Sequence, residues 1–293
     1  MSELQRERLV AVPRERGWQV GQAARAAKPL SAEELGPRTV GGVLDRAFEV
    51  LRDHFGLLMG AGLILCVPMR ILMFFQVQPA FSGEAWEPLV EVGVTSVLAS
   101  LLGALAARVF GAHVAGGDTS AGRMLGIGPL EFMGILLLSA VTGTLTGLGV
   151  CLFFVGTFIV SWLFALAPVI YMLETERGPL MRVPYAMKRS ISLVTGSFWR
   201  WLGLFMVLVL LSLFLQGPLG QLDDPIARTT FAVNYGLSTR VVDLAVCLLG
   251  GVFTALIAAL SGVVFASFYF DQRARLEGVD LHFALQKLKR RSS

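Results

Sequence analysis

The chain has 293 residues, of which 55% are hydrophobic and 16% are charged. Soluble domains carry about 25% charged residues, and the mean hydropathy of +0.67 argues against a soluble enzyme, a disordered chain and a nucleic-acid-binding protein. The 25 Lys and Arg residues exceed the 21 Asp and Glu residues by only four. The position of the charges is therefore more informative than their sum.

The first part of the chain is polar and leads into an amphipathic segment. Residues 1–36 interleave arginines with glutamates and show no lasting hydrophobic period, which predicts a flexible cytoplasmic tail. They contain no apolar region before a small-residue cleavage site, so a cleaved signal peptide is not predicted. From Arg38 to Phe55 apolar residues recur at helical spacing. This pattern predicts a helix in the headgroup plane that continues directly into the membrane.

Long apolar runs follow, at residues 56–77, 89–114, 129–173, 201–216 and 241–268. A bilayer core of about 30 Å needs roughly 20 apolar residues per helix. As one helix, the run 129–173 would be about 67 Å long, so it predicts two helices with a turn near 147–149. The last run is long enough to tilt or to project. The predicted fold is an all-α membrane bundle with six transmembrane helices and interfacial amphipathic helices on the cytoplasmic side.

The basic residues support this count of spans and predict an orientation. With six spans, 22 of the 25 Lys and Arg residues fall on one side. They lie in the two tails and the first amphipathic helix, at Arg108 near the end of the second run, and in the loops between spans two and three and between spans four and five. Arg228 and Arg240 fall on the other side, and Arg70 lies within the first span. Because cytoplasmic loops are enriched in Lys and Arg, we expect a bacterial inner-membrane protein with both termini in the cytoplasm.

Two segments that lie 143 residues apart have similar patterns. Residues 46–58 and 189–201 are both amphipathic and carry an aromatic residue just before a span, and residues 118–130 are a weaker version. This similarity predicts a membrane domain at 37–281 built from three units, each an amphipathic helix and two spans, followed by a basic tail at 282–293. The alternative is that any cytoplasmic loop before a span tends to be amphipathic.

Small residues recur at close to four-residue spacing within the predicted spans. They include Gly103, Ala107 and Gly111 in the second span, Ser139, Gly143 and Gly147 in the third, and Gly251, Ala255, Ala259, Gly262 and Ala266 in the sixth. Small residues at this spacing let helix backbones approach closely in lipid. We expect them to pack the bundle internally rather than to form a dimer interface.

The sequence carries no familiar catalytic or metal-binding motif. It lacks HExxH, GxSxG and the phosphate-binding GxxxxGK[ST], and its three histidines are far apart along the chain. Among ionisable residues within the membrane, Arg70 is expected to extend to the outer headgroups or to pair with Glu91. No row of acids or bases predicts a proton relay. We therefore expect a non-enzymatic protein without a cofactor, a metal or a nucleic-acid partner.

Three cytoplasmic segments carry a family resemblance, at 38–56 (RTVGGVLDRAFEVLRDHFG), 167–199 (APVIYMLETERGPLMRVPYAMKRSISLVTGSFW) and 269–281 (YFDQRARLEGVDL). They resemble the bacterial membrane-protein family named after the membrane domain of glycerophosphoryl diester phosphodiesterases, over residues 37–281. In some members this domain precedes a soluble phosphodiesterase barrel. Only about 25 residues follow the last span, so we expect no such barrel here and take no hydrolase activity from the resemblance.

The last of these segments alternates opposite charges at helical spacing, which allows pairing within a helix and with lipid phosphates. We interpret it as a structural clasp against the interfacial helices, with Gly278 ending the helix. The candidate interaction or structural residues are Arg70, Glu91, Arg189, Asp271, Arg273, Arg275, Glu277 and Asp280. The predicted function is a membrane scaffold or accessory subunit for lipids or partner proteins. The alternative is a transporter or channel for a small or lipid-like molecule.

Overall fold

A computed structural model describes residues 37–72, 87–115, 119–150, 155–175, 177–220 and 225–278. All regular secondary structure within these ranges is helical. Six stretches are long and apolar enough to cross a membrane. The prediction of an all-α bundle with six membrane-spanning helices is therefore confirmed, and the chain is a multi-pass membrane protein.

The amphipathic segment and the first span form two consecutive helices, as predicted. Helix α2 (Val40–Asp53) begins after Thr39, whose hydroxyl accepts a hydrogen bond from the Gly42 amide at 3.2 Å. This bond satisfies one of the free amides at the helix start. The apolar face of α2 is buried, the chain turns at His54, and α3 (Phe55–Leu72) continues as the first span.

The remaining spans follow the predicted runs closely. They are α5 (Glu87–Ala115), α7 (Pro129–Val150), α8 (Val155–Phe164) with α9 (Ala167–Leu173), α11 (Phe198–Gly220) and α13 (Thr239–Glu277). The predicted division of the run 129–173 is confirmed, although α7 continues to Val150, slightly beyond the predicted turn. With 39 residues, α13 is about 58 Å long, so part of it extends beyond a bilayer core, as its sequence predicted.

Small residues let α13 pack closely against α3 and α5. A Cβ atom added to Gly262 would lie 2.7 Å from the Cβ of Ala106 on α5. A Cβ atom added to Gly62 on α3 would lie 2.9 Å from the Cβ of Ala255. Real Cβ atoms do not approach so closely, so these glycines are required where the helices touch. The expectation that they pack the bundle internally is confirmed at these positions.

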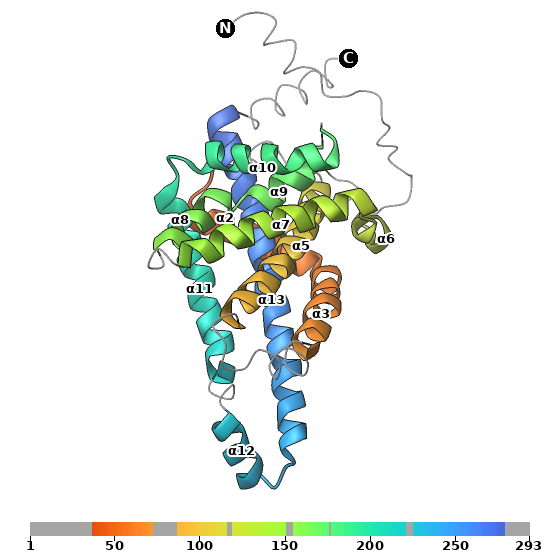
Figure 1. The fold of residues 1–293 in the computed structure, drawn as a ribbon. Helices are drawn as coiled ribbons and strands as arrows, with labels where there is room; N and C mark the ends of the chain where they lie inside the picture. Colours follow the sequence, from red (N-terminus) through yellow and green to blue (C-terminus); the bar gives the residue numbers. More distant parts are fainter. Residues whose placement is uncertain are drawn as a thin grey trace, which may run out of the picture.

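The shorter helices are distributed unevenly along α13 (Figure 1). Helices α2, α9 and α10 (Pro179–Val194) lie around its C-terminal part. In the same region α7 and α8 run across the long helices. At the other end, α12 (Pro225–Asn234) lies beside the N-terminal part of α13. We call the first of these ends the α10 end. Between the described residue 119 and the start of α7 at Pro129, the helical structure is the five-residue helix α6 (Ala121–Leu125). The threefold repeat stays a prediction.

Candidate functional site

At the α10 end, the carboxylate of Asp271 joins three segments of the chain. Its side chain is 3% exposed, and one oxygen accepts the backbone amide of Arg38 at 2.7 Å. The other oxygen lies 2.7 Å from an Arg200 guanidinium nitrogen and 3.2 Å from Arg275 Nε. The carbonyl of Arg38 accepts hydrogen bonds from both guanidinium groups. Charge-assisted hydrogen bonds of this kind are stronger than neutral ones, so Asp271 ties the entry to α2 and the start of α11 to α13.

A second carboxylate, that of Glu174 directly after α9, joins α9, α10 and α13. It accepts hydrogen bonds from the hydroxyls of Tyr185 on α10, at 2.5 Å, and Tyr269 on α13, at 2.8 Å. Arg189 Nε lies 3.5 Å from one of its oxygens. Arg189 also pairs with Glu277, so a single guanidinium connects the two carboxylates across α10 and α13.

The last turns of α13 add pairs within the helix. Arg273 Nε donates to Glu277 at 2.8 Å, and its terminal nitrogen donates to the Tyr269 hydroxyl at 3.1 Å. Gly278 ends the helix with a φ of 59°, in the left-handed region that favours glycine, as predicted. The carboxylates of Asp271 and Glu277 thus have partners both on α13 and on neighbouring segments.

The structure brings together most of the site residues that the sequence predicted. Five of them belong to these two networks: Arg189, Asp271, Arg273, Arg275 and Glu277. Asp280 lies outside the described residues. The pattern of opposite charges four residues apart was sufficient to find the pairs within α13, because both members lie on one helix.

Sequence reasoning missed the partners that other helices provide. Glu174, Tyr185 and Tyr269 were not selected, although the first two lie in the family-like segment 167–199 and the third begins the segment 269–281. The available signal for Glu174 was a glutamate directly after an apolar run. Arg200 was counted only as a basic loop residue, whereas it pairs with a buried carboxylate.

Arg70 lies apart from the networks of the α10 end. It is on α3 and faces α13, where its Nε would lie 3.5 Å from a Cβ atom added to Gly250. The backbone of Glu91 belongs to α5, but its side chain lies outside the described residues. The Arg70–Glu91 pair therefore stays a prediction.

Two histidines that are distant in sequence meet where α2 joins α3. The Nε2 atom of His54 lies 3.1 Å from Nδ1 of His113, near the end of α5. Burial is the main cause that lowers the pKa of His54, the neighbouring His113 lowers it further, and Asp53 opposes both. Protonation of His54 is consequently less favourable in the folded protein.

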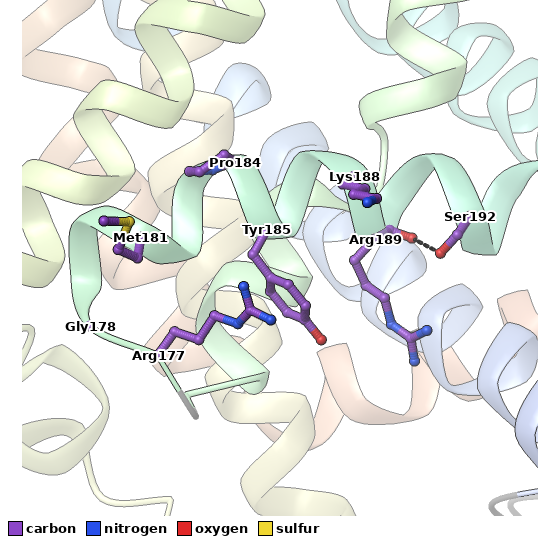
Figure 2. Close-up of a pocket in the computed structure, with 8 residues that line it drawn as sticks. All are labelled: Arg177, Gly178, Met181, Pro184, Tyr185, Lys188, Arg189 and Ser192. Carbon is purple, nitrogen blue, oxygen red and sulfur yellow. Dashed lines mark hydrogen bonds between the residues drawn. The ribbon is translucent and has the colours of Figure 1, made fainter. Parts of the chain in front are cut away.

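The outer side of α10 carries an open groove of 770 Å³ (Figure 2). The described residues that line it are Arg177, Gly178, Met181, Pro184, Tyr185, Lys188, Arg189 and Ser192. Figure 2 shows Arg177, Tyr185 and Arg189 extending to the same side of α10, and the Arg177 guanidinium lies 4.3 Å from the centre of the Tyr185 ring. These residues include three basic side chains and no carboxylate, a composition that suits an anionic group.

Comparisons with protein-family models, with curated proteins and with solved structures find no match for this chain. The resemblance to the membrane domain of glycerophosphoryl diester phosphodiesterases therefore stays a prediction based on the three segments. Within the part of the chain that the structure describes, no three His, Cys, Asp or Glu side chains form a group that could hold a metal ion.

Proposed function

We propose that this protein is a non-enzymatic scaffold of a bacterial inner membrane that binds anionic lipid headgroups in the α10 groove. The observation that carries this proposal is the contrast between two sets of charges at the α10 end. The carboxylates of the two networks are occupied by arginines and tyrosines. Arg177 and Lys188, in contrast, are exposed in a groove whose described lining has no acidic residue.

The two networks support a structural role for their residues. A catalytic carboxylate must reach a substrate or exchange a proton with it. Asp271 is 3% exposed and has three partners, and Glu174 is 13% exposed and has three partners. The bonds of these two carboxylates hold α2, α10 and α11 against the rest of the bundle. This supports a scaffold more than an enzyme.

The groove supports binding of an anion. Lys188 forms no ion pair with any described residue, and Arg177 is exposed with its guanidinium 4.3 Å from the centre of the Tyr185 ring. A basic side chain near an anionic membrane surface contributes about 1 kcal/mol. Two such residues therefore contribute about 2 kcal/mol, or roughly 30-fold in affinity.

The surroundings of the groove support a position at the membrane surface. Leu180 and Met181, at the start of α10, are 56% and 71% exposed. Exposed apolar side chains beside basic ones are typical of helices that lie in the headgroup region. The excess of basic residues on one side of the bundle supports a cytoplasmic position for this surface.

The proposal is tested by measuring how many anionic lipids the protein retains in mild detergent. Native mass spectrometry compares retention of phosphatidylglycerol with that of phosphatidylcholine for the wild type and for the double variant Arg177→Gln/Lys188→Gln. We expect the double variant to lose its preference for phosphatidylglycerol by roughly 30-fold. The control is Arg52→Gln, whose side chain on α2 is 80% exposed and does not line the groove. An unchanged preference in the double variant would refute headgroup binding there.

The second candidate function is a transporter or channel for a small or lipid-like molecule. The observation that favours it is an inner cleft of 380 Å³ between the spans, whose described lining includes hydroxyl groups. The same lining contains no charged residue, and Arg70 does not belong to it. Flux of ions and of labelled lipids across proteoliposomes separates the two functions. Flux that depends on the protein would favour transport. The purified protein could instead hydrolyse a phosphodiester or a lipid and lose this activity when one acidic residue is replaced. That result would overturn both the scaffold and the transporter proposals.

A further inference from the structure

The inner cleft is elongated along the helices. Its lining extends along α13 from Thr254 to Phe265 and along α11 from Trp201 to Gln216. Eleven residues of helix span about 16 Å. With this length and a volume of 380 Å³, the cleft has room for one extended hydrocarbon chain.

Besides the amide of Gln216 and two threonines of α7, five hydroxyl groups from three helices line the cleft. They belong to Ser96 and Ser100 on α5, Ser161 on α8, and Thr254 and Ser261 on α13. Serine and threonine hydroxyls within helices usually bond to a carbonyl of their own helix, but these five form no hydrogen bond with any described residue. Ser100 as a whole residue is 7% exposed, but its hydroxyl oxygen is not fully buried, and neither are those of the other four. The five hydroxyls therefore face accessible space, and because the apolar surroundings offer them no hydrogen bond, a ligand oxygen in the cleft would be stabilised.

Two threonines of α7 show how the wall differs from ordinary packing. Thr142 and Thr146 line the same cleft and donate to carbonyls of their own helix, at 2.9 and 2.8 Å. Their hydroxyls are thus already satisfied. The free hydroxyls are those on α5, α8 and α13, so the polar end of a ligand is expected against these helices.

The position of the cleft selects a ligand from the bilayer. Its lining residues belong to stretches that are apolar enough to span the membrane, and Ala99 in the lining is exposed. An opening at this place meets hydrocarbon rather than water. The described lining has no charged side chain that could replace the hydration of an ion, so an uncharged and largely apolar ligand fits better than an ion.

We propose that this cleft binds one hydrocarbon chain of a lipid, with the hydroxyls of Ser100 and Ser261 bonded to the ester or hydroxyl oxygens at one end of that chain. Two sources share this chemistry: a single-chain lipid such as a monoacylglycerol, and one of the two chains of a phospholipid. This site is separate from the α10 groove. The variant Arg177→Gln/Lys188→Gln should keep the bound chain, so the two proposals can fail independently.

The test is photo-crosslinking of the full chain in mild detergent. One probe is a monoacylglycerol and the other a phosphatidylcholine, both with a diazirine in the same acyl chain. Mass spectrometry should find crosslinks on the lining parts of α5, α11 and α13. Replacing Ala258 with phenylalanine fills the cleft and should reduce this labelling at least tenfold. The control Leu210→Phe, at a 65% exposed position of α11 outside the lining, should leave it unchanged.

The two probes distinguish the two sources of the chain. Labelling by both supports a chain of any lipid, and labelling by the monoacylglycerol alone supports a single-chain lipid. Crosslinks only on outward-facing residues, or labelling that Ala258→Phe does not change, would overturn the proposal.

A second variant keeps the test decisive if Ala258→Phe does not fold. The pair Ser100→Ala/Ser261→Ala removes two hydroxyls and leaves the cleft open. It should weaken labelling by the monoacylglycerol probe threefold or more and leave labelling by an alkyl diazirine without an ester unchanged. Equal effects on both probes, or no effect on either, would refute the role of the hydroxyls.

Discussion

Replacing Asp271 with alanine removes the carboxylate that three segments of the chain share. The side chain is 3% exposed, and its partners Arg200 and Arg275 are 24% and 39% exposed. Removing one member of a buried ion pair costs about 3–5 kcal/mol, because the other charge is left without a partner. Since water reaches both arginines in part, the screening is larger here, and we expect a loss of about 2–4 kcal/mol.

The loss is measured as the change in free energy of unfolding when the purified protein is titrated with denaturing detergent. The variant Arg52→Ala is the control, because the Arg52–Asp53 pair is 80% and 41% exposed and should contribute less than about 1 kcal/mol. In a double-mutant cycle, Asp271→Ala and Arg200→Met should be non-additive by at least about 1 kcal/mol. A loss below about 0.5 kcal/mol for Asp271→Ala, or additive effects, would refute the inference that this carboxylate joins the helices.

Three further predictions follow from the same structure. Because the pKa of His54 is lowered from its ordinary value of 6.5, the unfolded chain binds more protons than the folded chain below this pH. The free energy of unfolding should therefore fall as the pH drops from 7.5 to 5. His54→Gln should reduce this pH dependence when unfolding is measured in denaturing detergent. Gly262→Ala should destabilise the protein by about 1–3 kcal/mol, since the added Cβ atom would lie 2.7 Å from the Cβ of Ala106. The control Gly60→Ala, where the added Cβ atom has no neighbour within 4 Å, should be neutral or slightly stabilising. Equal effects of the two variants would contradict the packing argument. A cysteine replacing Tyr235 after α12 should react with a membrane-impermeant thiol reagent in intact cells, whereas a cysteine replacing Lys188 should react only after lysis. Labelling at position 188 but not at 235 in intact cells would refute the predicted orientation.

Much of the fold could be predicted because its signals are local. The length and hydropathy of the apolar runs were sufficient for six spans, and the helical spacing of residues 38–55 was sufficient for α2. The pairs Arg273–Glu277 and Asp271–Arg275 were readable because their members lie four residues apart on α13. The end of α13 could be predicted from the sequence because glycine favours the left-handed conformation that ends many helices. Gly278 adopts this conformation in the structure.

The sequence by itself thus determined the class of the protein, its helices and the interactions within single helices. The tertiary structure decided which helices meet, and with them every partner that comes from another segment. Arg38 and Asp271 are 233 residues apart, and His54 and His113 are 59 apart, so no periodicity connects them. The inner cleft has the same origin: five hydroxyls on three helices line one space only because α5, α8 and α13 pack around it. Periodicity identifies the buried face of a helix, but the residues that cover this face depend on how all the helices pack together.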